Sequence, residues 1–283
     1  HHYMYANVIH IGHLVRVSSI MAHNTTLQSL IILTSKKIII MPNWVKNTVA
    51  LKGTKQQMTK LFSQVADVKT WEDVENKIGN LELTMRSFLP MPQTFLDWDT
   101  TNDMEKFDLF CCGKNQPKEE LYKEYQKYVR GYMEAREHQQ KMYGCVGWYD
   151  YNCKTLGCKW DANLECISIA DELEKDDIVI VYFSVETAWS IPIPFLQYLA
   201  TFVNVVVLSD EEANFFNSII DVNKDKEIKD ISQKINKLYR KFEEENKEVD
   251  EDEWFEEYEE EETKLKNELE DEFYQYVTDL EIS

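Results

Sequence analysis

The chain has 283 residues, of which 43% are hydrophobic and 29% are charged, and its net charge at neutral pH is −20. This length and apolar content suffice for one or two globular domains with a hydrophobic core. The strong negative charge excludes direct binding of nucleic-acid phosphates by the acidic part of the chain, because like charges repel.

The negative charge is concentrated at one end of the sequence. Residues 241–283 hold twenty acidic residues and four lysines, a net charge of −16, whereas residues 1–40 hold three basic residues and no acidic one. Residues 41–240 carry the remaining net charge of −7. This distribution favours a basic protein surface as a partner, such as one that normally holds nucleic acid.

Residues 1–40 differ in composition from the remainder. They contain five of the six histidines and show no helix caps and no sustained hydrophobic period. We expect either upstream sequence translated in frame, with Met41 as the natural start, or a genuine extension, weakly ordered in both cases. The apolar run 27–41 is interrupted by Lys36 and Lys37, so neither half is long enough to span a bilayer. Free thiols and a cytoplasmic location are therefore expected.

The pattern becomes regular at Met41. Residues 41–53, MPNWVKNTVALKG, alternate between apolar and polar and predict a strand that ends in a turn. Residues 54–66 have apolar residues at helical spacing, with Thr54 as the N-cap. Residues 83–92 predict a second strand, which prolines end.

A long helix is predicted for residues 117–143, followed by two strand-rich runs at 155–171 and 177–189. A helix capped by Ser190 follows, and then a strand at 203–209.

This order predicts an α+β fold: a ferredoxin-like βαββαβ sandwich over residues 41–208, with a helical insertion at about 117–143.

Residues 209–283 predict an acidic helical region. A capping box from Ser209 to Glu212 opens it, and narrow apolar stripes continue on both sides of 246–252. That segment is either a turn between two antiparallel helices or part of one long helix. Each stripe needs a partner, which leaves a homo-oligomer through the C-terminal helices as one possibility.

Four short motifs in fixed order resemble the YubB-like ferredoxin-like domain family of phage and plasmid proteins. They are MPNWVKN (41–47), FLPMP (88–92), LGCKWDA (156–162) and TAWSIPIP (187–194).

The resemblance covers about residues 41–208 and implies a ferredoxin-like domain on mobile elements of a bacterial host. It implies no established reaction and no catalytic residues. The motif positions that it marks, which are as easily architectural as functional, are Asn43, Trp44, Asn47, Pro90, Lys159, Trp160, Asp161, Thr187, Trp189 and Pro192.

The alternative to a binding protein is a small enzyme or a metal site in the Cys-, Trp- and Asp-rich region 145–189. Its candidate ligands are Cys145, Cys153, Cys158 and Cys166. The intervening stretches of seven, four and seven residues lack the close pairs of a structural zinc site, so buried thiols are the favoured interpretation. No histidine, serine or lysine is paired by a motif with Asp161 or Glu186, so we expect no catalysis and no cofactor.

The acidic segment 250–262, DEDEWFEEYEEEE, interleaves carboxylates with aromatic side chains. The simple interpretation is a solvated helix face. The sharper one is a nucleic-acid mimic that occupies a basic surface on a host protein, such as a defence complex. The contact residues predicted for it are Trp254, Phe255, Glu256, Glu257, Tyr258, Glu259 and Glu260. No direct nucleic-acid binding and no membrane association are expected.

Overall fold

The computed structural model describes residues 43–98, 119–170, 177–211, 216–246 and 251–282. The chain divides into two units, His1–Met41 and Pro42–Ser283, and all described residues belong to the second. The predictions for residues 1–40 and for the start at Met41 therefore lie outside the described residues.

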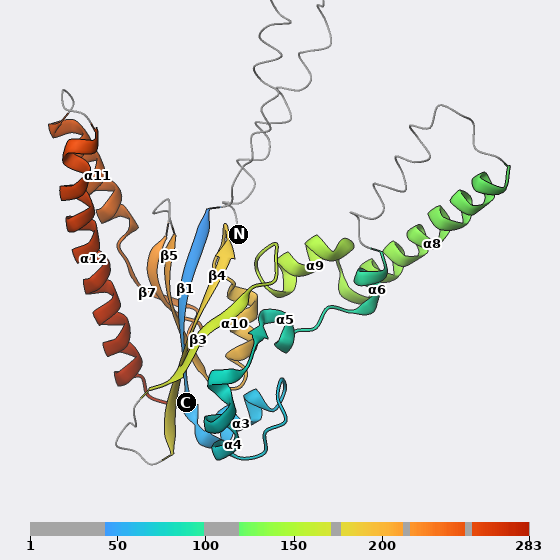
Figure 1. Cartoon of the computed structure of the whole chain (residues 1–283), viewed down its shortest axis with the longest axis horizontal. Coiled ribbons are helices and arrows are strands. Elements are labelled where there is room, and N and C mark those ends of the chain that lie inside the picture. The colour runs from blue at the N-terminus through green and yellow to red at the C-terminus, as the bar shows by residue number, and fades with distance from the viewer. Residues whose placement is uncertain (1–42, 99–118, 171–176, 212–215, 247–250, 283) are drawn as a thin grey trace, which may run out of the picture. The chain divides into compact units, whose positions relative to one another are not determined.

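The fold is organised around a seven-stranded sheet in the order β2-β3-β4-β1-β5-β6-β7, in which every neighbouring pair is antiparallel (Figure 1). The central pairing sets Trp44 of β1 opposite Ala188 of β4. The strands are β1 (Trp44–Thr54), β2 (Leu83–Thr84), β3 (Asn163–Ile169), β4 (Ile178–Ala188), β5 (Asn204–Glu211), β6 (Asn217–Asp221) and β7 (Lys226–Asp230).

Helices cover both faces of this sheet, which explains why β4 reads as an almost continuous apolar run. Val181 and Val185 of β4 belong to a core shared with the first group of helices, and Ile180 belongs to a second core shared with the other group. The first group is α3 (Lys55–Phe62), α4 (Trp71–Lys77), α5 (Met85–Phe88) and α10 (Ile193–Leu199); the second is α11 (Ser232–Glu245) and α12 (Glu251–Asp279).

Three further helices form the insertion: α6 (Gln93–Asp97), α8 (Glu119–Tyr143) and α9 (Gly147–Thr155). Phe95 of α6 is fully buried there, with its ring centroid 4.5 Å from that of Tyr151 in α9 and 5.2 Å from that of Tyr143 in α8. A short 3-10 turn, Ile78–Asn80, completes the described elements.

The mixed α and β composition is confirmed, as are the first strand and the helix after it. Thr54 caps α3 in a reciprocal capping box with Gln57, as its position predicts. Most of the strand predicted for 83–92 is wrong, because Thr84 and Ser87 form a second capping box that starts α5.

The C-terminal region also differs from its prediction as a purely helical segment. Ser209 is buried within β5 instead of opening a helix, and β6 and β7 add a hairpin to the sheet. Beyond the hairpin, α11 ends at Glu245 and α12 begins at Glu251, so two helices follow and not one. They pack side by side through Tyr239 and Trp254, whose ring centroids lie 5.8 Å apart.

A buried lysine fixes the end of α12 to the sheet. Lys52 of β1 is 5% exposed, and its ammonium donates to the carbonyls of Val277 at 3.0 Å and of Thr278 at 2.7 Å. Both carbonyls belong to the last turn of the helix, where they lack an intrahelical partner and the helix dipole favours a cation.

Lys52→Met is expected to lower the free energy of unfolding by about 1–3 kcal/mol, since it removes charge-assisted hydrogen bonds to two carbonyls. Urea unfolding measures the loss, and amide exchange should rise first in the last turn of α12. Lys46→Met, at an exposed position of the same strand, is the control. An unchanged exchange rate at Val277 to Asp279 would contradict the capping role.

Candidate functional site

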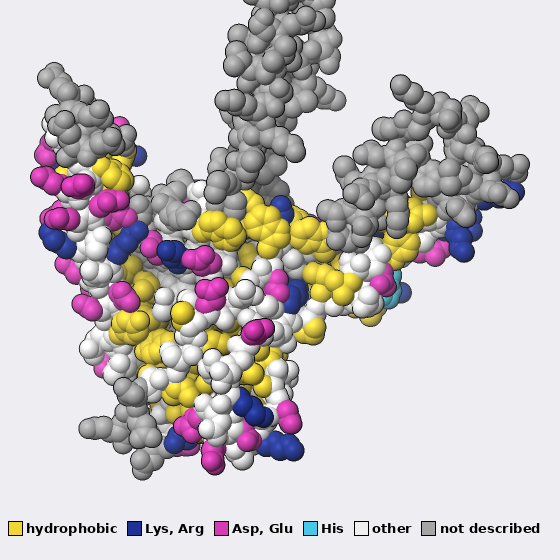
Figure 2. Space-filling view, in the orientation of Figure 1, with side chains coloured by type: hydrophobic (Ala, Val, Ile, Leu, Met, Phe, Trp, Pro, Cys, Tyr) yellow, Lys and Arg dark blue, Asp and Glu magenta, His cyan; other side chains and the backbone are white. Residues whose placement is uncertain are grey.

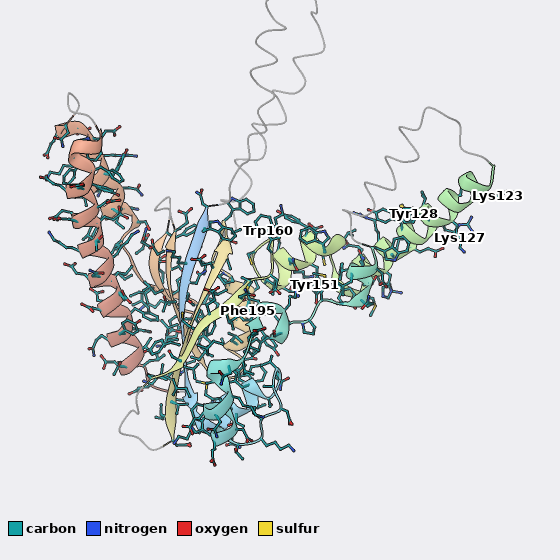
Figure 3. The ribbon with its side chains drawn as sticks, in the orientation of Figure 1. Lys123, Lys127, Tyr128, Tyr151, Trp160 and Phe195 are labelled. Carbon is teal, nitrogen blue, oxygen red and sulfur yellow. The ribbon has the colours of Figure 1, made fainter. Side chains whose placement is uncertain are left out.

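Three segments that are distant in sequence meet at one end of the sheet. Trp44 starts β1, Trp189 follows β4, and Lys159 and Trp160 precede β3, while Tyr149 comes from the insertion helix α9. We call these five residues the tryptophan surface. Figure 3 labels Trp160 at this end of β1 and β4, and Figure 2 shows hydrophobic side chains gathered there.

The aromatic rings of this surface lie close together and remain accessible. The ring centroids of Trp160 and Trp189 are 5.3 Å apart, and those of Trp44 and Trp160 are 6.5 Å apart. Tyr149 is 50% exposed, Trp160 38% and Trp189 42%. Large aromatic side chains normally bury most of their surface, so three exposed ones together are a mark of a binding surface.

Lys159 supplies the positive charge of the surface. Its ammonium lies 4.5 Å from the ring centroid of Trp160, 5.7 Å from that of Trp189 and 5.9 Å from that of Tyr149. The lysine thus makes cation–π contacts with all three exposed rings, each of about 0.5–1 kcal/mol at an accessible site. These contacts hold a mobile side chain in place among the indoles.

A chain of buried and partly buried hydrogen bonds supports the surface from below. Ser209 Oγ donates to Asn47 Oδ1 at 2.8 Å, and Asn47 Nδ2 donates to Thr187 Oγ1 at 3.0 Å. Thr187 Oγ1 donates to the carbonyl of Ser190 at 2.7 Å, and Ser190 Oγ donates to the carbonyl of Gly157 at 2.7 Å. This network joins β5, β1, β4 and the loop before Lys159, so it fixes the backbone that carries the indoles.

A second network holds the loop with Lys159 and Trp160 against the helices. The guanidinium of Arg86 donates to the carbonyl of Leu89 at 2.6 Å and to Asn152 Oδ1, and Asn152 Nδ2 donates to the carbonyl of Lys159 at 2.7 Å. Asp161 Oδ1 accepts from the backbone N–H of Arg86 at 3.0 Å. The FLPMP and LGCKWDA motifs are thereby connected through α5 and α9.

Trp189 has a strained backbone. Its φ is 65°, in the left-handed region that residues other than glycine rarely adopt. Its backbone N–H donates to the carbonyl of Asn43 at 2.9 Å. A bulky residue in this region costs of order 1–3 kcal/mol. The indole of Trp189 is exposed, and such strain is concentrated at functional sites in proteins.

The ten motif residues therefore divide into supporting and exposed positions. Asn47 and Thr187 are buried supports, and Trp44 is half-buried. Pro192 is buried and is the N-cap of α10 in place of Ser190, whereas Pro90 is exposed. The remaining positions, which lie at or beside the tryptophan surface, are Asn43, Lys159, Trp160, Asp161 and Trp189.

The cysteines do not assemble into the alternative metal site. Within the described ranges, no group of three or more histidine, cysteine, aspartate or glutamate side chains is arranged to hold a metal ion. Cys145 and Cys158 are buried, and Cys153 and Cys166 are exposed. Burial raises the pKa of the Cys158 thiol to about 12, and burial also raises the pKa of Cys145 and Cys153. These thiols therefore lack the lowered pKa that marks a reactive cysteine.

The contact residues predicted in the acidic segment divide into aromatic side chains that are largely buried and glutamates that are exposed. Trp254 and Tyr258 are 7% and 4% exposed because they pack on Tyr239 and Phe242 of α11, and Phe255 is half-buried. The structure thus assigns these aromatic side chains to the core between α11 and α12, which corrects their assignment to a partner contact. The exposed members of the set are Glu256, Glu257, Glu259 and Glu260.

Several contributors to the site were not predicted from the sequence. Arg86 and Ser209 act through long-range hydrogen bonds, for which the sequence holds no local signal. Gly157 adopts a φ of +85°, and its place within the LGCKWDA motif was the one available indication of a special backbone.

No helix in the described part of the chain combines the length and apolarity needed to cross a membrane. Comparisons of the chain with family models, with curated proteins and with solved structures find no match.

Proposed function

We propose that this chain is a binding protein without catalytic activity, and that it binds another protein through the tryptophan surface. The observation that carries the proposal is the exposure of Tyr149, Trp160 and Trp189 around the ammonium of Lys159. Tryptophan and tyrosine are among the side chains that dominate binding energy at protein interfaces.

The rigidity of the surface supports the same proposal. Rings that are fixed before binding lose little conformational entropy when a partner covers them. The hydrogen-bond chain from Ser209 to Gly157 and the backbone of Trp189 hold the segments that carry the indoles. Backbone strain at an exposed tryptophan is expected where the indole takes part in binding.

Site-specific photo-crosslinking tests the proposal. A photoreactive phenylalanine analogue replaces Tyr149 in one variant and Tyr274 in another, because Tyr274 is an exposed aromatic residue of α12, 40% accessible. In a bacterial lysate we expect one protein to crosslink from position 149 and not from position 274, and Lys159→Glu to abolish that crosslink. Equal labelling from both positions would show that the tryptophan surface has no selectivity for a partner.

A second contact, with a basic protein surface, is favoured by the outer face of α12. Glu256, Glu257, Glu259 and Glu260 are exposed on a helix whose other side is buried against α11 and the sheet. Carboxylates at this spacing form a continuous anionic strip that a basic host surface would recognise, as a nucleic-acid mimic requires. Because Trp254 and Tyr258 are buried and cannot reach a partner, this contact would depend mainly on charge.

Changing all four of these glutamates to glutamine is expected to lower affinity for a basic partner by about tenfold at low salt and to flatten its salt dependence. The matched control removes the same charge elsewhere, at the exposed residues Glu72, Glu82, Glu134 and Glu137. Affinity measured between low and high ionic strength distinguishes the two variants. The mimic is wrong if both quadruple variants lose the same affinity.

The finer fold assignment is part of the proposal. We infer that β1, α3, β3, β4, α10 and β5 form a ferredoxin-like core, to which β2, β6 and β7 are added. The adjacent order β3-β4-β1-β5 and the antiparallel pairing of these strands support it. The origin from a phage or plasmid, and a role against a host defence complex, rest on the motif resemblance.

A further inference from the structure

A groove between α3 and α4 differs in charge from the chain around it. It has a volume of about 590 Å³ and is lined by Lys55, Lys60 and Lys69, with Val68 and Trp71 on its apolar side. No acidic side chain is among the described residues that line it. The groove gathers three lysines within residues 41–240, whose net charge is −7.

We propose that this groove binds an organic phosphate that carries a planar ring, such as a mononucleotide. The lysine ammonium groups supply donors and charge for the phosphate. The indole of Trp71 supplies a surface for the ring. The volume lies within the range of about 300–1,000 Å³ that small-ligand sites occupy.

The groove is held in shape before any ligand binds. Asp73 Oδ2 accepts from the backbone N–H groups of Lys69 at 2.9 Å and of Thr70 at 3.0 Å, and Lys77 Nζ donates to the carbonyl of Asp67 at 2.5 Å. These bonds fix the loop that carries Lys69. Val68 in the same loop is 5% exposed and anchors it in the core.

The side chains of the groove also have defined positions. Trp71 Nε1 donates to the carboxylate of Glu75, which orients the indole. The ammonium of Lys60 lies 5.8 Å from the ring centroid of Phe202. The hydroxyl of Thr59 donates to the carbonyl of Lys55 at 2.8 Å, so the lysines and not this hydroxyl are the donors to an anion.

The acidic helices lie on the other side of the sheet from this groove. The α3 and α4 helices pack on one face of the sheet, and α11 and α12 pack on the other (Figure 1). The sheet therefore lies between the groove and the carboxylates of α12.

Calorimetric titration of the full chain with ATP, pyrophosphate and adenosine tests the proposal. The lysine variant is Lys55→Gln/Lys60→Gln/Lys69→Gln. The control, Lys226→Gln/Lys234→Gln/Lys237→Gln, removes the same charge from exposed positions of β7 and α11. Circular dichroism and thermal unfolding check that both variants fold.

We expect ATP to bind more tightly than pyrophosphate or adenosine, and the groove variant to lose at least about tenfold in affinity while the control keeps it. An equal loss of affinity in both variants would show that net charge alone causes the loss, and it would overturn the groove as the binding site. Pyrophosphate that binds as tightly as ATP would overturn the role of the ring. The absence of saturable ATP binding by the unaltered chain would overturn the proposal as a whole.

Discussion

Gly157→Ala is expected to destabilise the chain by about 3–5 kcal/mol, the largest loss that we predict for a single methyl group. A Cβ at this position would lie 2.5 Å from Pro194 Cδ and 3.2 Å from the backbone nitrogen of Ile193. The proline ring cannot rotate away, and the φ of +85° is itself strained for alanine. The carbonyl of Gly157 also accepts the hydrogen bond from Ser190 that supports the tryptophan surface.

Two other glycines separate the causes of this loss. Gly147 has a φ of +83° but nothing within 4 Å of the position that an alanine Cβ would occupy, so Gly147→Ala should show the cost of strain alone, about 1 kcal/mol. Gly79 has neither restriction, and Gly79→Ala should be close to neutral. Urea unfolding of the three variants gives the comparison. A Gly157→Ala variant as stable as Gly147→Ala would show that the loop before α10 yields easily and does not hold the surface.

The double change Trp160→Ala/Trp189→Ala is expected to weaken binding of the crosslinked partner by at least about 100-fold. Each indole at the centre of an interface contributes about 2 kcal/mol or more to affinity, and the two rings act next to each other. Since more than half of each indole is buried, the double change should also lower the free energy of unfolding by about 2–4 kcal/mol, and circular dichroism checks that the variant folds. The affinity is measured with purified partner by surface plasmon resonance.

Tyr274→Ala provides the control for this pair, because it removes an exposed aromatic ring from α12 and leaves the tryptophan surface intact. Its affinity should stay within about threefold of the unaltered chain. A double tryptophan variant that binds as well as Tyr274→Ala would exclude the tryptophan surface from the interface.

The local parts of this fold could be predicted from sequence. The Thr54 cap, the apolar alternation of β1 and the run of β4 are each determined by residues close in the chain. The strands β6 and β7 were missed because the alternation in 217–230 is short and charged residues dominate β7. An edge strand needs little apolar surface, and its charges protect it from further pairing.

The candidate site was only partly predictable, because it depends on contacts between segments that are far apart in the sequence. The motifs marked Trp160 and Trp189, but their approach to Tyr149 depends on the packing of α9, which no motif covers. In the acidic region, Trp254 and Tyr258 occur at the helical spacing of i and i+4, which indicates a buried stripe as readily as a contact surface. The groove of lysines had a weak signal: residues 44–66 contain four lysines and no acidic residue.

The most direct test of the proposed function compares the affinity of the crosslinked partner for three chains: the unaltered protein, Trp160→Ala/Trp189→Ala, and the variant with glutamine at 256, 257, 259 and 260. Measured at physiological salt, the tryptophan variant is expected to lose at least about 100-fold and the glutamine variant no more than about tenfold. The opposite order, with the tryptophan variant unimpaired and the glutamine variant inactive, would refute binding through the tryptophan surface and assign it to the acidic face of α12.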